Sequence, residues 1–347
     1  MARTVYLHIG MPKCATTSVQ DFLSAERAAL ADTGLSYVQH PGDAPGRKGN
    51  GIPLAQARFA RDSARAAEIL DVFLQGEGDV LLSSEMFYDL ARGVRIAEMF
   101  DQIRARGCEV RVICYLRRQD YWIESDFKQQ IKDLGGWSEP LSALIAQRAH
   151  TRTLNYTWLL MNWARHAGLE NVLVEPLVPG QPPDHALHRF LHRIDRPQLI
   201  AAASAVGRSN ESPPTGLIEA ARFLKRGWAA RGQPEAAVMA QLAQFFATAP
   251  DRVAVPARRF LLPLAERRRL VQRYARVNAV LGQRFLDGGD PFGDALVEDA
   301  ASEVPLAEEA ADVLAQYLLP TAPERHLGDL AGRGLRWGAR RLGHRRR

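Results

Sequence analysis

The sequence predicts an α/β fold: a three-layer sandwich with a central parallel sheet flanked by helices, followed by a helical C-terminal extension. Apolar runs at residues 5–9, 80–82 and 110–116 each pass into a helical pattern, which is typical of strand–helix units in a parallel sheet. From about residue 213 the pattern is mostly helical. The 347 residues are enough to bury a full core, so we expect one domain over residues 1–325.

The first strand–helix unit, residues 5–20, has the form of an anion-binding site. An apolar strand ends at Gly10, a short loop carries Lys13, and a helical pattern begins at Thr16. The N–H groups in the first turn of a helix have no partner within it, and together with the helix dipole they bind phosphate. Asp21 is the first acidic residue after the loop, so the expected site holds one cation and no carboxylate.

The spacing in this loop differs from that of nucleoside triphosphatases. Their loop, G-x-x-x-x-G-K-[ST], places a lysine at the start of the helix. Here Ala15 stands in the position of the second glycine and Thr16 in that of the lysine, whereas Lys13 lies inside the loop. The alternative to a phosphate site is an ordinary strand–helix turn capped by Thr16 or Thr17.

The loop pattern P-K-x-[GA]-T-T resembles the 5′-phosphosulfate loop of sulfotransferases that use 3′-phosphoadenosine 5′-phosphosulfate (PAPS), which have a P-loop-like fold. The resemblance is to bacterial, carbohydrate-type members and extends over roughly residues 4–295. It implies that the loop binds the 5′-phosphate of PAPS and that Lys13 also takes part in catalysis. The implied binding residues are Lys13, Cys14, Ala15, Thr16, Thr17 and Ser18.

A second pair of residues carries the same resemblance. The apolar run at residues 110–116 ends at Arg117, and Ser125 follows eight residues later in a predicted helix at 121–131. In these sulfotransferases an arginine at a strand end and a serine eight residues on bind the 3′-phosphate. An arginine fork and a hydroxyl suit a terminal phosphate dianion. The alternative is a solvated Arg117 and a Ser125 on the helix surface; Arg118 is expected to be a partner or a surface residue.

A candidate general base follows the strand at residues 80–82. Ser83, Ser84 and Glu85 come directly after it, at the carboxyl end where open α/β sheets bind ligands. Sulfuryl transfer to an alcohol needs a base for the hydroxyl proton. Small-molecule sulfotransferases have a histidine here, whereas the resemblance to carbohydrate-type members implies Glu85 as base and acceptor contact. Alternatively, Glu85 is the N-terminal carboxylate of the next helix. Ser84 either caps that helix or touches the acceptor.

Four further side chains are candidates that also have a simple surface explanation. Arg208 and Asn210, in a polar turn before a helical stretch at 217–228, are either cofactor ligands or part of a surface helix N-cap. Lys48 lies in a Gly- and Pro-rich loop, and Lys128 follows the candidate serine by three residues. These two lysines either contact the acceptor or lie on solvated surfaces.

The net charge of +6 comes from the C-terminus. Residues 331–347 contain seven arginines and no acidic residue, and the rest of the chain carries 38 basic and 39 acidic side chains. The body therefore lacks the cationic excess of a nucleic-acid-binding surface, and no nucleic-acid partner is expected. We expect residues 326–347 to form a disordered basic tail, with weak contact to an anionic membrane surface as the alternative.

The three cysteines, Cys14, Cys108 and Cys114, have no metal-ligand spacing, and we expect no metal. No apolar leader precedes Val5 and no run of 18 apolar residues occurs, so we expect a reduced, cytoplasmic protein. In the anion loop, the thiol of Cys14 either has a lowered pKa or only fills space.

The sequence thus predicts transfer of a sulfuryl group from PAPS to a hydroxyl acceptor, and the family resemblance implies a carbohydrate or glycolipid acceptor. A P-loop kinase or nucleoside triphosphatase would share the fold, but the lysine at the helix start and a clear Mg²⁺-binding aspartate are missing. A non-catalytic nucleotide-binding protein would keep the loop and lose the base.

Overall fold

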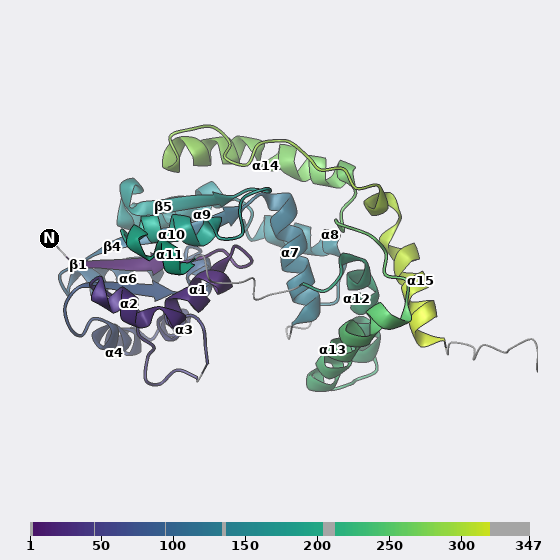
Figure 1. Ribbon diagram of the computed structural model, residues 1–347, viewed down its shortest axis with the longest axis horizontal. Coiled ribbons are helices and arrows are strands. Elements are labelled where there is room, and N and C mark those ends of the chain that lie inside the picture. Colours follow the sequence, from purple (N-terminus) through teal and green to yellow (C-terminus); the bar gives the residue numbers. More distant parts are fainter. Residues whose placement is uncertain (1–2, 45, 94, 134–136, 204–211, 320–347) are drawn as a thin grey trace, which may run out of the picture.

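A five-stranded parallel sheet forms the centre of the computed structural model, which describes residues 3–44, 46–93, 95–133, 137–203 and 212–319. The strand order is β2-β3-β1-β4-β5 (Figure 1). The strands are β1 (Arg3–His8), β2 (Leu35–Ser36), β3 (Asp79–Ser83), β4 (Cys108–Arg117) and β5 (Val172–Leu177). The predicted α/β class and the parallel central sheet are confirmed.

The three apolar runs form the middle of this sheet. Leu7 of β1 lies opposite Leu82 of β3 and Val112 of β4, and all three side chains are fully buried. The next residue, His8, lies opposite Ser83. Because β1 pairs with β3 on one side and with β4 on the other, the carboxyl ends of all three strands meet at one edge of the sheet, where α/β sheets bind ligands.

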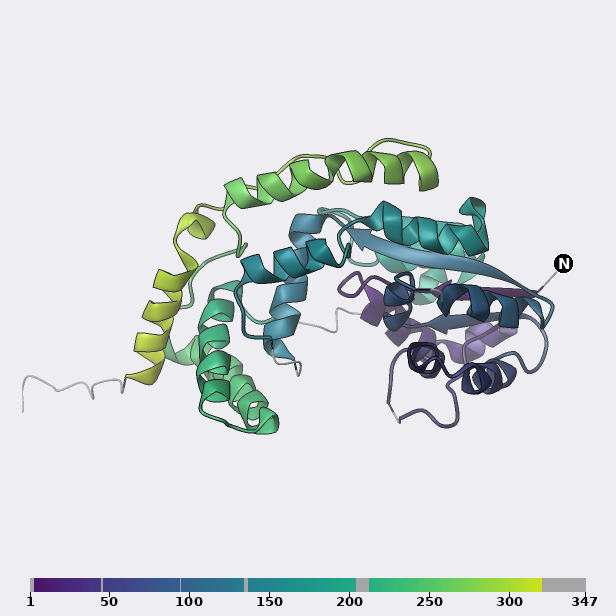
Figure 2. The ribbon, with the colours of Figure 1, turned by 180° about the vertical axis from the view of Figure 1, so that it is seen from behind.

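Helices cover both faces of the sheet, as in a three-layer sandwich. On one face lie α1 (Thr16–Ala25), α2 (Arg27–Asp32), α10 (His185–Arg193) and α11 (Ile200–Ala203). On the other lie α6 (Arg95–Arg104) and α9 (Tyr156–Ala167), which face the viewer in Figure 2. Helices α3 (Ile52–Ala60) and α4 (Ser63–Phe73) connect β2 with β3, and α5 (Met86–Leu90) follows β3.

Residues 212–319 are mostly helical, as predicted. Helices α12 (Ile218–Ala230), α13 (Glu235–Arg252) and α15 (Leu306–Leu318) pack together beside the sheet, and α14 (Leu264–Phe285) returns along α9 (Figure 1). Between these parts lie α7 (Gln119–Lys132) and α8 (Leu141–His150). No helix in the described ranges is long and apolar enough to cross a membrane. The expected tail at 326–347 lies outside the described residues.

A buried carboxylate joins α7 to the helical part. Glu124 accepts hydrogen bonds from the N–H groups of Leu261 (3.0 Å) and Leu262 (2.9 Å). Burial raises the pKa of this carboxyl to about 7, although the two N–H groups and Lys128 oppose the rise. The protonated form is therefore favoured in the folded protein relative to the unfolded chain.

The raised pKa of Glu124 should lower the free energy of unfolding as the pH rises. Between about 4.5 and about 7 the folded state binds more protons at Glu124 than the unfolded state, so the free energy of unfolding decreases with pH in that window. The loss is on the order of 3 kcal/mol. Urea unfolding at a series of pH values should show this decrease for the wild type and a flatter profile for Glu124→Gln. Glu303 is the control, because it is exposed and also accepts from a backbone N–H, that of Leu264.

The Glu303→Gln variant should show the same dependence of the free energy of unfolding on pH as the wild type. A difference in stability between the wild type and Glu124→Gln that stays constant from pH 4.5 to 7 would contradict this assignment.

Candidate functional site

A cavity of about 1050 Å³ opens at the sheet edge where β1, β3 and β4 end. It brings together residues that are far apart in the sequence, from the first loop to α7. The predicted site residues that line it are Lys13, Ala15, Thr16, Thr17, Ser18, Lys48, Glu85, Arg117, Ser125 and Lys128. Cys14 and Ser84 do not line it, and Arg208 and Asn210 lie outside the described residues.

The loop between β1 and α1 is folded tightly against the start of the helix. A Cβ atom at Gly10 would lie 2.5 Å from Cγ2 of Thr16, so only glycine permits this approach. Lys13 and Ala15 have φ values of 66° and 60°, in the left-handed region. Each such non-glycine residue costs roughly 1–2 kcal/mol, and strain of this kind is typical of functional loops.

The N-terminus of α1 supplies hydrogen-bond donors to the cavity. The first intrahelical bond runs from the N–H of Val19 to the carbonyl of Ala15, so the N–H groups of Thr16, Thr17 and Ser18 have no partner within the helix. The hydroxyl of Thr16 is buried and has no hydrogen-bond partner among the described residues. Such a set of donors is suited to an anion.

Lys13 reaches from this loop to α7. Its Nζ donates a hydrogen bond to Oε1 of Gln129 at 2.7 Å, and Gln129 in turn contacts Asp133. Burial lowers the pKa of Lys13, Glu85 and Asp133 oppose this, and Arg117 contributes to the lowering. Lys13 follows β1, Glu85 follows β3 and Arg117 ends β4, so groups from the ends of three strands interact electrostatically at the Lys13 ammonium.

The sequence did not indicate the residues of α7 that hold the loop. Besides Gln129, Trp122 donates from Nε1 to the carbonyl of Pro12 at 2.7 Å. Gln129 follows Ser125 by one turn, and this helical spacing is the one signal that could have pointed to it.

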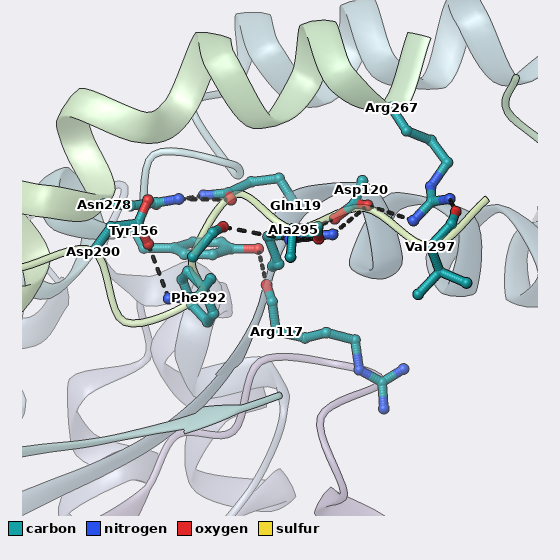
Figure 3. Close-up of polar contacts among 12 residues, drawn as sticks. Arg117, Gln119, Asp120, Tyr156, Arg267, Asn278, Asp290, Phe292, Ala295 and Val297 are labelled. Carbon is teal, nitrogen blue, oxygen red and sulfur yellow. Dashed lines mark hydrogen bonds and ion pairs between the residues drawn. The ribbon is translucent and has the colours of Figure 1, made fainter. Parts of the chain in front are cut away.

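Arg117 is the last residue of β4, and its side chain is half-buried at the cavity. Figure 3 shows it leaving the polar cluster above β4 and running toward the loop that follows β1. Its guanidinium has no hydrogen bond or ion pair to another residue that the structure describes. Ser125 lines the same cavity from α7. A cationic fork and a hydroxyl are thus placed together, which suits a phosphate.

Arg118 has a different environment from its neighbour. It is 4% exposed, and its guanidinium forms an ion pair with Asp120 at 2.7 Å. The surface position considered for Arg118 is therefore wrong, because this buried ion pair holds its side chain inside the protein.

Glu85 stands at the N-cap position of α5 and lines the cavity half-buried. Its side chain makes no capping hydrogen bond. The hydroxyl of Ser84 instead accepts from the N–H of Met86 at 3.2 Å, so Ser84 caps the helix, the first of the two roles considered for it. The Glu85 carboxylate is left facing the cavity near Lys13.

Two other predicted residues, Lys48 and Lys128, have partners of their own. Nζ of Lys48 lies 2.7 Å from a carboxylate oxygen of Asp21. Lys128 donates to the hydroxyl of Thr215 at 2.6 Å, and burial lowers its pKa. Both lysines are bonded at the cavity wall.

Cys14 is fully buried, and burial raises the pKa of its thiol to about 12. The N–H of Cys14 donates to the carbonyl of Met11 at 3.2 Å. A lowered pKa for this thiol is therefore wrong: the side chain packs into the core, where a thiolate would be poorly solvated.

No protein-family model, curated protein or solved structure matches this chain. Within the described ranges, no group of three or more His, Cys, Asp and Glu side chains could hold a metal ion. The function proposed below therefore depends on the geometry of the cavity and on the motifs that line it.

Proposed function

We propose that this protein is a PAPS-dependent sulfotransferase with a P-loop-like α/β fold. It transfers a sulfuryl group to a hydroxyl acceptor, for which the motif resemblance favours a carbohydrate or glycolipid. The observation that supports the proposal is that two separate sets of groups suited to a phosphate line one cavity. Lys13 and the N-terminus of α1 form one set, and Arg117 with Ser125 forms the other.

The residues at the cavity fit the two ends of PAPS. The unpaired N–H groups and the buried Thr16 hydroxyl provide donors for a 5′-phosphate. Arg117 and Ser125 provide a fork and a hydroxyl for the 3′-phosphate that distinguishes PAPS from ATP. PAPS supplies the activated sulfuryl group, whose S–O bond to the 5′-phosphate breaks as the acceptor oxygen forms a new S–O bond.

The chain contributes charge stabilisation and proton transfer to this displacement. Glu85 accepts the proton of the acceptor hydroxyl. Lys13, with the N–H groups of Thr16 and Thr17, stabilises the negative charge that collects on the phosphate oxygen, which is electrostatic preorganisation toward the leaving group. In this proposal the ammonium and the amides take the part that Mg²⁺ has in a kinase.

Calorimetric titration with adenosine 3′,5′-bisphosphate and with ATP, each with and without Mg²⁺, tests the proposal. We expect the bisphosphate to bind more tightly and independently of the metal. Preference for Mg²⁺-ATP would instead indicate a P-loop kinase or nucleoside triphosphatase. Bisphosphate binding without transfer to any of a panel of saccharides would indicate a non-catalytic nucleotide-binding protein.

Replacing Glu85 with Gln is expected to lower kcat for sulfuryl transfer by about 10²- to 10⁴-fold, because the acceptor proton loses its base. The dissociation constant of adenosine 3′,5′-bisphosphate should change less than about twofold, since Glu85 contributes to the transition state and not to nucleotide binding. The measurement is transfer from radiolabelled PAPS to a panel of saccharides, together with calorimetry.

Asp89→Asn is the matched control for Glu85→Gln. Asp89 is a second carboxylate lining the cavity, one turn further along, and it is paired with Arg92 at 3.0 Å. Its variant should keep kcat within about twofold of the wild type. Equal loss of kcat in both variants would show that Glu85 has no special role.

A further inference from the structure

The two adjacent arginines at the end of β4 have opposite roles in the fold. Arg117 lines the cavity, whereas Arg118 is buried against Asp120, which is itself fully buried. Nε and Nη2 of Arg118 bond the two oxygens of Asp120 at 2.7 and 3.1 Å. This bidentate fork fixes which of the two side chains enters the cavity.

The same cluster holds a distant segment, residues 290–297, which we call the strap. It belongs to the connection between α14 and α15 and crosses the end of β4 in Figure 3. Arg118 donates to the carbonyls of Gly293 (3.3 Å) and Ala295 (2.7 Å). Arg267 of α14 pairs with Asp120 at 3.1 Å and donates to the carbonyl of Val297 at 2.7 Å.

A second contact reaches the backbone of Arg117 itself. The hydroxyl of Tyr156 donates to the Arg117 carbonyl at 2.8 Å. The ring of Phe292, a strap residue, packs edge-on against the Tyr156 ring with a centroid distance of 6.1 Å. The strap therefore supports Arg117 through Tyr156 as well as through Arg118.

No residue of the strap lines the candidate-site cavity in the part of the chain that the structure describes. Its effect on the site therefore passes through residues that lie beside Arg117: the charged cluster at the junction between β4 and α7, and Tyr156. Three buried charges meet at this junction: Asp120 forms one ion pair with Arg118 and another with Arg267, and the shared carboxylate ties the start of α7 to α14.

We infer that Arg118 is a positioning residue for 3′-phosphate recognition, and that the strap is the element through which the C-terminal part sets the direction of Arg117. This inference rests on the proposed function. An orientation error of about 1 Å in a binding group costs up to about 100-fold in function, so support of this kind matters even without contact to the nucleotide.

The test is the preference for adenosine 3′,5′-bisphosphate over adenosine 5′-phosphate, measured as a ratio of dissociation constants by calorimetry. Arg118→Lys keeps the charge but loses the bidentate fork, and we expect it to lower the preference about tenfold. Arg258→Lys is the matched control. Arg258 is buried to the same degree, pairs with Glu309 at 2.8 Å and donates to backbone carbonyls, but it does not touch the β4–α7 junction.

Arg258→Lys should lose thermal stability as Arg118→Lys does, yet keep the wild-type preference. Tyr156→Phe is a milder second variant, which removes one hydroxyl and keeps the ring; we expect it to lower the preference about threefold. If Arg118→Lys kept the wild-type preference for the bisphosphate, this inference would be overturned and the proposed function would stand. If Arg118→Lys does not fold, an unchanged preference in Tyr156→Phe would have the same meaning. A wild type without preference for the bisphosphate would overturn the proposed function and this inference together.

Discussion

Replacing Lys13 with Ala should lower kcat/KM for sulfuryl transfer by at least about 10²- to 10³-fold, the cost of removing a donor from a developing anion. Lys13 is the one cation inside the loop, and burial at the cavity makes its charge interactions stronger than in water. The fold should be retained, because the ammonium lies at the cavity and the bond from Trp122 to the Pro12 carbonyl still holds the loop against α7. Two quantities are measured: kcat/KM for sulfuryl transfer from radiolabelled PAPS, and the midpoint of thermal unfolding.

Lys132→Ala is the control for the loss of Lys13. Lys132 is an exposed lysine that lines the same cavity, so its variant removes the same charge from a different position. The kcat/KM of this variant for sulfuryl transfer should stay within about threefold of the wild-type value, as expected for the loss of a solvated charge. Transfer by Lys13→Ala at a rate within tenfold of the wild type would exclude Lys13 as the group that stabilises the leaving phosphate.

Replacing Arg117 with Ala should weaken adenosine 3′,5′-bisphosphate binding by about 100-fold, the range for a lost charge-assisted bond. Adenosine 5′-phosphate should be affected less than about threefold, because the proposed function assigns its phosphate to the Lys13 loop and not to Arg117. Calorimetry with both nucleotides separates a specific contact from a general loss of positive charge.

Arg148→Ala supplies the comparison for Arg117→Ala. Arg148 is another arginine at the cavity, but it is paired with Asp126 at 2.8 Å. Its variant should leave the preference for the bisphosphate unchanged. If Arg117→Ala weakened both nucleotides equally, Arg117 would be a general electrostatic contributor and the 3′-phosphate would need another ligand.

The sequence was sufficient for the parts of the site that depend on local pattern. Each strand end follows from an apolar run of a few residues, and parallel pairing then brings Lys13, Glu85 and Arg117 to one edge of the sheet. The helical stretch predicted at 217–228 also follows from local periodicity, and it corresponds to α12 (Ile218–Ala230).

Contacts between distant residues could not be predicted in this way. The Lys13–Gln129 bond joins residues 116 positions apart, and the Arg118–Ala295 bond joins residues 177 apart. Neither partner carries a local signal for the other. Cys14 shows a second limit, because its position in an anion loop suggested a lowered pKa, whereas the left-handed turns at Lys13 and Ala15 accompany a thiol buried in the core.

The order of the strands also has a consequence for synthesis on the ribosome. The first strand to emerge is the central one, and it cannot pair until the residues near 80 and 110 have followed. Arg118 cannot form its bond to Gly293 until 175 more residues have been synthesised. At typical bacterial and eukaryotic elongation speeds this synthesis takes on the order of 10 to 30 s. A nascent chain interrupted before the strap would contain all five strands but lack the contacts that Arg118 makes with Gly293 and Ala295. If the protein selects a nucleotide as proposed, it would acquire that selectivity only late in synthesis.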